Sequence, residues 1–251
     1  MLGLRDGITA LLFDLDGVLT KTADVHAAAW KEMFDGVLAE HDGEPGVDAR
    51  PFDTKADYHQ YVDGKPRYDG VRDFLASRGL HPPEGTADDT AADETIRGLG
   101  DRKNIAVQEI IRTKGVEAYA GSVEYLHAAR DAGFGIAVVS SSANAEAVLA
   151  AAGLSEFITV RIDGKVAADE GITGKPAPDM FLVAAERLGA TPDTSAVFED
   201  AISGVRSGAA GHFAMVVGVD RGGQPEALRE AGATIVVDDL ADLLDPAATP
   251  G

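Results

Sequence analysis

The sequence predicts an α/β fold, a doubly wound parallel sheet into which a separate helical unit is inserted. Residues 8–13 are a short apolar run, which is typical of a fully buried strand in a parallel sheet. Residues 22–116 then show helical patterns without a convincing strand. From residue 119 onward, apolar runs and helical patterns alternate, as in successive β–α units. We therefore expect a core made of residues 1–21 and 117–251, with residues 22–116 as a helical insertion.

The inserted residues predict three helical segments separated by polar loops. Thr22 can cap the first helix, over 23–40, whose inward stripe is expected to contain Val25, Ala29, Phe34 (or Met33) and Val37 (or Leu38). The other helices are expected over 58–78, with an interruption at 64–66, and over 92–113. Residues 41–57 and 81–91 are rich in Gly, Pro and acidic residues and are predicted as loops.

The second part of the core predicts the remaining strands and helices in alternation. Strands are expected at 135–139, 157–162, 196–198, 212–219 and 234–237. Helices are expected at 122–131, 145–152, 202–210, 226–230 and 240–244, and another is opened by residues 175–179 and runs to 188. Proline suits the start of this last helix, where its missing N–H costs little.

Composition restricts the classes of function. The chain has 251 residues, 42 Asp and Glu against 22 Lys and Arg, and a formal net charge of −20. Such a surface repels nucleic acid and anionic membranes, so we expect neither as a partner. Cysteine is absent, which excludes disulfides, thiolate catalysis and cysteine-based zinc sites. The sequence shows no signal-peptide pattern and no apolar stretch of membrane-spanning length, so we expect a cytoplasmic protein. We also expect it to be a monomer.

Polar side chains follow three of the predicted strands, at the point where each strand ends. The carboxyl ends of parallel strands meet at one edge of the sheet, and that edge is where open α/β sheets bind ligands. A lysine, Lys175, lies in a proline-flanked turn between the last two of these groups. The groups at the strand ends are Asp14 with Asp16, Ser140, and Glu199 with Asp200. Because side chains alternate along a strand, we expect Asp14 and Asp16 to point to the same side.

These residue types suit phosphoryl transfer. A carboxylate can attack phosphorus and form an aspartyl-phosphate, and a second carboxyl can exchange a proton with the leaving and accepting oxygens. Carboxylates without nearby His or Cys ligands favour Mg²⁺. Such a cation and Lys175 would offset the repulsion among the carboxylates and the charge of the phosphoryl group.

Competing motifs fail on their own residues. An EF-hand loop needs an acidic or amide residue where Val18 stands. A phosphate-binding P-loop needs Ser or Thr after Gly174-Lys175, where the sequence has Pro176, and no Gly-x-Ser-x-Gly elbow of a serine hydrolase is present.

The ordered set Asp14-Leu15-Asp16-Gly17-Val18, Ser140, Lys175 and Glu199-Asp200 resembles the four motifs of the haloacid dehalogenase superfamily. The resemblance implies Mg²⁺-dependent chemistry on a Rossmann-like core. It makes Asp14 the nucleophile, Asp16 the general acid/base, Ser140 a phosphoryl ligand, and Lys175 the group that holds both nucleophile and phosphoryl. Asp14, Glu199 and Asp200 would bind Mg²⁺, and Asp16 would contribute its backbone carbonyl.

The inserted unit is similar to the helical cap of the β-phosphoglucomutase branch of that superfamily. The segment from Thr22 to His26, followed by Trp30, resembles the branch's segment after the first motif, in which the histidine orients the acid/base. Further matching elements are Gly64-Lys65-Pro66-Arg67, Arg102-Lys103-Asn104, Ser140-Ser141-Ser142-Ala143-Asn144 and the segment from Gly174 to Asp179. By resemblance Arg67, Lys103, Asn104, Trp30, Ser141, Ser142 and Asn144 contact a phosphorylated sugar. The resemblance covers nearly the whole chain except the loops at 41–56 and 81–91, which look longer than the branch needs.

Three functions remain open at this stage. One is a phosphosugar mutase that interconverts β-glucose 1-phosphate and glucose 6-phosphate through an aspartyl-phosphate and glucose 1,6-bisphosphate. Another is a phosphatase that releases phosphate from a sugar phosphate, and the third is a non-catalytic sugar-phosphate-binding protein. Arg67 and Lys103 favour the mutase, because a mutase must hold a second phosphate. The complete set of acid, base, lysine and metal ligands argues against the binding protein.

Overall fold

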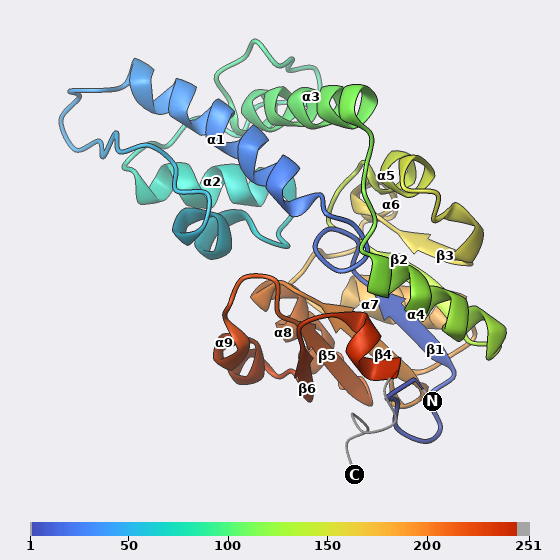
Figure 1. Ribbon diagram of the computed structural model, residues 1–251. Helices are drawn as coiled ribbons and strands as arrows, with labels where there is room; N and C mark the ends of the chain where they lie inside the picture. The colour runs from blue at the N-terminus through green and yellow to red at the C-terminus, as the bar shows by residue number, and fades with distance from the viewer. Residues whose placement is uncertain (1, 245–251) are drawn as a thin grey trace. The chain divides into compact units, whose positions relative to one another are not determined.

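The computed structural model describes residues 2–244 (Figure 1). The chain divides into two compact units. Unit 1 runs to Thr22 and resumes at Val116, and unit 2 is Ala23–Gly115. Among the described residues, no helix is long and apolar enough to cross a membrane.

Unit 1 contains a parallel six-stranded sheet in the order β3-β2-β1-β4-β5-β6. The strands are β1 (Ala10–Phe13), β2 (Gly135–Val139), β3 (Val160–Ile162), β4 (Ser195–Glu199), β5 (Met215–Val219) and β6 (Ile235–Val237). β1 lies between β2 and β4, so the direction in which strands are added reverses there. This confirms the predicted doubly wound sheet, and a reversal of this kind marks the ligand-binding edge of such sheets.

Helices connect the strands of unit 1. The α-helices are α4 (Ala120–Asp131), α5 (Ala145–Ala151), α6 (Gly164–Glu170), α7 (Asp179–Arg187), α8 (Ile202–Ala210) and α9 (Pro225–Ala231). The 3₁₀ turns are η2 (Ser155–Phe157), η3 (Pro192–Thr194) and η4 (Leu240–Leu244).

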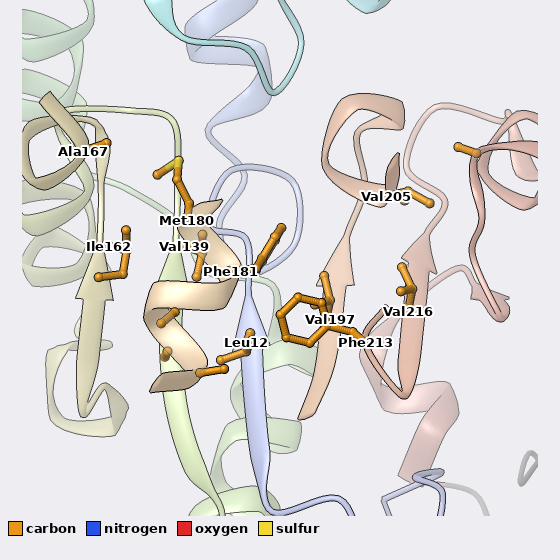
Figure 2. Packing of buried hydrophobic residues seen from close by; sticks show 14 of the residues in the cluster. Leu12, Val139, Ile162, Ala167, Met180, Phe181, Val197, Val205, Phe213 and Val216 are labelled. Carbon is orange, nitrogen blue, oxygen red and sulfur yellow. The ribbon is translucent and has the colours of Figure 1, made fainter. Parts of the chain in front are cut away.

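Alternation along the buried strands gives the sheet two apolar faces. On one face Leu12, Val139 and Val197 pack with Met180 and Phe181 of α7, as Figure 2 shows. On the other face the ring of Phe13 stacks on Phe198 with centroids 4.4 Å apart, and Tyr125 of α4 contacts both rings. Helices therefore hold the central strands from both sides, which fixes the strand ends that carry the polar groups.

Several predicted boundaries of unit 1 are wrong. β5 begins at Met215 rather than at 212, because His212 has a positive φ of 54° and ends the turn after α8. β3 begins at Val160 because residue 157 belongs to η2. The sequence analysis also missed α6, which Asp163 caps by accepting hydrogen bonds from the backbone of Lys165 and Val166.

Unit 2 is helical, with an aromatic core. Its helices are α1 (Ala23–Glu40), the π-helical turn η1 (Tyr58–Val62), α2 (Arg67–Ser77) and α3 (Ile96–Lys114). Phe34 of α1 lies 4.1 Å from Phe74 of α2 and 5.3 Å from Phe52, centroid to centroid. The predicted break at 64–66 is confirmed. α3 begins at Ile96 rather than at 92, because the Thr95 side chain caps it by accepting from Gly98 N.

The long loop after α1 is part of the unit 2 core. Its Phe52 is buried, and the backbone N–H of Phe52 donates to Asp35 Oδ1 at 2.7 Å. Arg78, at the end of α2, donates to Asp57 at 2.6 Å and to Asp48 at 3.4 Å. The expected inward stripe of α1 is confirmed at Ala29, Phe34 and Val37, whereas Val25 is only half-buried.

Candidate active site

The site in unit 1 is built around the ammonium group of Lys175. Lys175 Nζ donates to Asp14 Oδ1 at 2.6 Å, to Glu199 Oε1 at 2.5 Å and to the Val139 carbonyl at 2.9 Å. These three acceptors stand at the ends of β1, β4 and β2. One buried cation thus joins three neighbouring strand ends, and it brings together Asp14 and Glu199, two of the residues that the sequence places at one sheet edge.

Burial and charge act in opposite directions on this lysine. Burial disfavours the charged ammonium, but the carboxylates of Asp14 and Glu199 outweigh it and raise the pKa of Lys175 above its usual range. Burial raises the pKa of Glu199, and the ammonium of Lys175 limits that rise. Lys175 is therefore charged at neutral pH and keeps Asp14 close to the end of β2.

Three carboxylates form a group that can hold a metal ion. Oxygen atoms of Asp14, Glu199 and Asp200 all lie within 4.8 Å of one another. Two glycines make room for them: a Cβ on Gly17 would lie 1.8 Å from Asp200 Oδ2, and one on Gly204 would lie 1.8 Å from Glu199 Oε1. A set of oxygen donors of this kind fits a hard divalent cation such as Mg²⁺.

The serine segment lies after β2. Ser140 is buried, its N–H donates to the Ile162 carbonyl at 3.0 Å, and its Oγ accepts from the Ser142 N–H at 3.1 Å. Ser142 Oγ in turn accepts from the Asn144 N–H at 3.2 Å. Gly164 at the start of α6 packs against this segment, and a Cβ there would lie 2.5 Å from the Ser141 carbonyl oxygen. The missed helix α6 therefore supports the serine segment.

Asp16 lies beyond the end of β1, so the strand alternation expected to align it with Asp14 does not reach it. Its Oδ1 instead accepts a hydrogen bond from the Thr22 hydroxyl. The Thr22 hydroxyl also lies 2.8 Å from that of Thr20, and both threonines are buried. Sequence reasoning gave Thr22 only a capping role and missed this contact; two hydroxyls spaced two residues apart after the acidic motif were the available signal.

Three of the residues predicted in unit 2 come together. Lys103 Nζ of α3 lies 2.7 Å from His26 Nδ1 and 4.6 Å from the centroid of the Trp30 ring, both on α1. Burial, and next the charge of Lys103, hold the pKa of His26 well below its usual range. At neutral pH His26 is therefore uncharged, and Nδ1 can accept from the ammonium. Asn104, the next residue along α3, is half-buried.

Arg67 has a different setting, at the start of α2. Its Nη2 donates to Asp101 Oδ1 at 2.9 Å and to the Tyr68 hydroxyl at 3.0 Å, and its guanidinium lies 4.9 Å from the centroid of the Tyr68 ring. Tyr68 itself donates to the same Asp101 oxygen at 3.0 Å. Arg67 is thus held by Asp101, a partner that the sequence analysis did not anticipate.

A family model of haloacid dehalogenase-like hydrolases matches residues 8–212. The chain belongs to this family. Within the haloacid dehalogenase-like family it is 55% identical over 247 residues to a beta-phosphoglucomutase from Mycobacterium bovis, covering 97% of this chain and 94% of that protein. It is 31% identical over 236 residues to the beta-phosphoglucomutase of Bacillus subtilis, covering 93% and 91%.

Solved structures of the family share the fold. A crystal structure of beta-phosphoglucomutase from Clostridium difficile has a TM-score of 0.73 and 26% identity, covering 94% of this chain and 93% of that one. The expected superfamily and branch are therefore confirmed, and the chain is an enzyme of the haloacid dehalogenase-like family.

Proposed function

We propose that this enzyme is a Mg²⁺-dependent phosphosugar mutase that interconverts β-glucose 1-phosphate and glucose 6-phosphate. The observation that carries the proposal is Lys175, which joins Asp14 to Glu199 at the strand ends of a chain 55% identical to a beta-phosphoglucomutase. The substrate is a small phosphorylated sugar, and we assign the enzyme to the cytoplasm as a monomer. Unit 1 is the catalytic core, and unit 2 is the cap.

In the first step Asp14 attacks the phosphorus atom of the bisphosphate. The new bond joins a carboxylate oxygen of Asp14 to phosphorus, and the bond between phosphorus and the sugar oxygen breaks. Lys175, already 2.6 Å from Asp14 Oδ1, holds the nucleophile and balances charge on the phosphoryl oxygens. Ser140 and the following Ser141, Ser142 and Asn144 are assigned to hold the phosphoryl group and sugar.

Asp16 is the general acid and base. It gives its proton to the departing sugar oxygen and takes a proton from the hydroxyl that later attacks the aspartyl-phosphate. The Thr22 hydroxyl donates to Oδ1 of Asp16 and so helps to hold this carboxyl group in place. After the first sugar monophosphate leaves, a molecule of the other sugar monophosphate binds. Its free hydroxyl accepts the phosphoryl group from Asp14, which regenerates the bisphosphate.

Asp14, Asp200, Glu199 and the backbone carbonyl of Asp16 would hold Mg²⁺. When bound, the ion offsets the negative charge shared by the phosphoryl group and the carboxylates. Both carboxylate oxygens of Glu199 also accept hydrogen bonds within the protein, one from Lys175 and the other from the Ala201 N–H at 3.2 Å.

The phosphate that is not transferred is assigned to cations of unit 2. Arg67 presents a planar fork that can hold phosphate in a bidentate fashion, and Asp101 keeps that fork in place through Nη2. Lys103 supplies a second cation beside Trp30, and Asn104 lies next to it. By resemblance, His26 orients the acid/base Asp16.

The alternative within the same family is a phosphatase, in which water rather than a sugar hydroxyl accepts the phosphoryl group from Asp14. Phosphorus NMR separates the two directly. β-Glucose 1-phosphate is incubated with enzyme, Mg²⁺ and a trace of glucose 1,6-bisphosphate, and the spectrum is followed with time. The mutase converts the substrate into glucose 6-phosphate. Release of inorganic phosphate as the main product would instead establish the phosphatase.

A further inference from the structure

Arg221 in unit 1 contacts the loop that follows Asp14 and Asp16 and ends at Thr20. It belongs to none of the four motifs. Arg221 lies directly after Asp220, at the carboxyl end of the sheet beyond β5. Asp220 Oδ1 accepts from the N–H groups of Gly223 at 2.7 Å and Gln224 at 2.9 Å. This turn fixes the backbone from which Arg221 extends, before α9 begins.

Arg221 uses its donors on separate parts of unit 1. Its Nε donates to the Gly17 carbonyl at 3.0 Å, and its Nη1 donates to the Asp238 carbonyl at 2.7 Å and to Asp239 Oδ2 at 2.9 Å. The guanidinium carbon lies 3.7 Å from the centroid of the Tyr119 ring. Only 19% of the side chain is exposed. A rigid, planar cation is thus held on several sides and pointed at the carbonyl of Gly17.

The backbone of Gly17 lies so close to Asp200 that a small shift of Gly17 would move this carboxylate. Its φ is +90°, a conformation that favours glycine, and a Cβ there would lie 1.8 Å from Asp200 Oδ2. Its N–H donates to the Thr20 carbonyl at 2.8 Å, which closes the loop after Asp16. The backbone of Gly17 therefore borders Asp200 on one side, while its carbonyl is held by Arg221.

The groups that hold Arg221 are themselves fixed. Asp239 Oδ1 accepts from the Ala241 N–H at 3.0 Å, and Gly121 leaves room for that carboxylate, since a Cβ there would lie 1.7 Å from the same oxygen. The Tyr119 N–H donates to the Leu19 carbonyl at 3.0 Å. Arg221 therefore ties the loop at Gly17 to Tyr119 and to the segment after β6.

We propose that Arg221 is a positioning residue of the reaction, which sets the loop from Asp14 to Thr20 and so the spacing of Asp14, the Asp16 carbonyl and Asp200 as Mg²⁺ ligands. This inference rests on the proposed function. Arg221 donates to Gly17, Asp238 and Asp239 rather than to the carboxylates assigned to the metal, so it acts through the Gly17 peptide. Loss of such an outer partner typically costs about 10–100-fold in metal affinity or activity.

Two variants of Arg221 distinguish a positioning role in the reaction from a role in fold stability alone. Arg221→Met keeps an apolar stem against Tyr119 and removes all the donors, while Arg221→Lys keeps the charge without the planar fork. In both variants we expect Mg²⁺ to bind about tenfold more weakly or worse, and kcat for acetyl phosphate hydrolysis to fall with little change in KM. Arg221→Lys should not rescue either quantity, because an ammonium cannot reach Gly17, Asp238 and Asp239 together.

Isothermal titration calorimetry with MgCl₂ on the full chain measures the affinity without turnover. Arg229→Gln is the matched control, since Arg229 on α9 makes an exposed ion pair with Glu226, and it should bind Mg²⁺ like the wild type. Asp200→Asn is the positive control for the site. Circular dichroism selects folded variants, and Arg221→Lys carries the test if Arg221→Met does not fold.

Wild-type Mg²⁺ affinity in either folded Arg221 variant overturns the inference while the proposed function stands, provided that Asp200→Asn binds Mg²⁺ weakly. Wild-type affinity in Asp200→Asn as well would remove the proposed metal site, and the inference with it. Tighter binding in Arg221→Lys than in Arg221→Met, approaching the wild type, would show that charge alone suffices and would also overturn it.

Discussion

Among residues 2–244, each unit buries one lysine, and the two lysines contact different groups. Lys175 in unit 1 is 2% exposed and contacts the carboxylates of Asp14 and Glu199. Lys103 in unit 2 is 5% exposed and borders the His26 imidazole and the Trp30 ring. The first cation organises anions that already belong to the chain, so its pKa rises. The second lies beside the His26 and Trp30 rings and lowers the pKa of His26. The difference suits the roles we propose, a fixed catalytic centre and a cation for an incoming phosphate.

The largest expected effect is that of removing the charge of Lys175. Lys175→Met leaves Asp14 and Glu199 buried together without their cation, so the free energy of unfolding should fall by about 3–5 kcal/mol in the absence of metal. Lys103→Met removes a cation from a ring face and should cost only about 1–2 kcal/mol. Denaturant unfolding of both variants in EDTA measures the difference. Equal losses of unfolding free energy in the two variants would mean that Asp14 and Glu199 do not make the removal of Lys175 more costly than that of Lys103.

Substitutions of Asp16 and Asp200 should separate the loss of proton transfer from the loss of metal binding. Asp16→Asn removes the acid/base, so kcat should fall by roughly 10²–10⁴-fold. Its Mg²⁺ affinity should stay close to that of the wild type, because the ligand we assign there is the backbone carbonyl. Asp200→Asn is the matched comparison and should lose affinity. A similar loss of affinity in Asp16→Asn and Asp200→Asn would contradict the role given to Asp16.

A smaller effect is expected at Arg67 in unit 2. Arg67→Ala removes a charge-assisted contact to the second phosphate, which should cost about 1.5–3 kcal/mol, or roughly 10–100-fold in the apparent affinity for the bisphosphate. Hydrolysis of acetyl phosphate, which has no second phosphate, should hardly change. Arg97→Ala is the control, since Arg97 also lies over the Tyr68 ring, at 5.1 Å.

Unchanged mutase kinetics in both Arg67→Ala and Lys103→Ala would remove the assignment of the second phosphate to unit 2 and favour the phosphatase. Equal losses with the bisphosphate and with acetyl phosphate would indicate a damaged unit 2 rather than a lost contact.

The smallest effect is a pH dependence of stability that comes from His26. Its pKa in the folded protein lies well below 6.5, so the unfolded chain takes up a proton first as the pH falls below that value. The stability is fully present above pH 6.5 and should be lost toward acid by up to about 1.4 kcal/mol per pH unit. His26→Gln should flatten that slope.

His59 provides the control for this measurement. A hydrogen bond to Asp63 raises its pKa, so its contribution is present below pH 6.5 and is lost as the pH rises through the folded value. His59→Gln should therefore leave the acid slope unchanged. An acid slope that survives in His26→Gln would show that burial beside Lys103 does not set it.

The sequence was sufficient for the sheet and for the residues at its edge, because both depend on local patterns. Apolar runs mark the strands, and the polar residues that follow them, such as Ser140 and Glu199, must lie at one edge of a parallel sheet. The sequence analysis missed α6 because this helix has only seven residues, too few for a clear helical pattern. Its remaining signals are single residues at its ends, the cap Asp163 and the final Gly171.

The sequence also could not predict which residues far apart in the chain contact each other. Nothing near Arg67 indicates that Asp101, 34 positions later, holds it. The roles of Thr22 at Asp16 and of Arg221 at Gly17 depend likewise on how the loops fold back. The loop containing Phe52 was predicted only as a loop, yet it supplies an aromatic ring to the unit 2 core.

The central claim is that Asp14 takes the phosphoryl group, and trapping that group tests it most directly. Enzyme incubated with Mg²⁺ and acetyl phosphate is quenched rapidly and treated with borohydride, which reduces an aspartyl-phosphate to homoserine, and peptides are then sequenced by mass spectrometry. We expect homoserine at position 14 in the wild type and none in Asp14→Asn, which should also be inactive. Homoserine at position 16, or full activity in Asp14→Asn, would contradict the account.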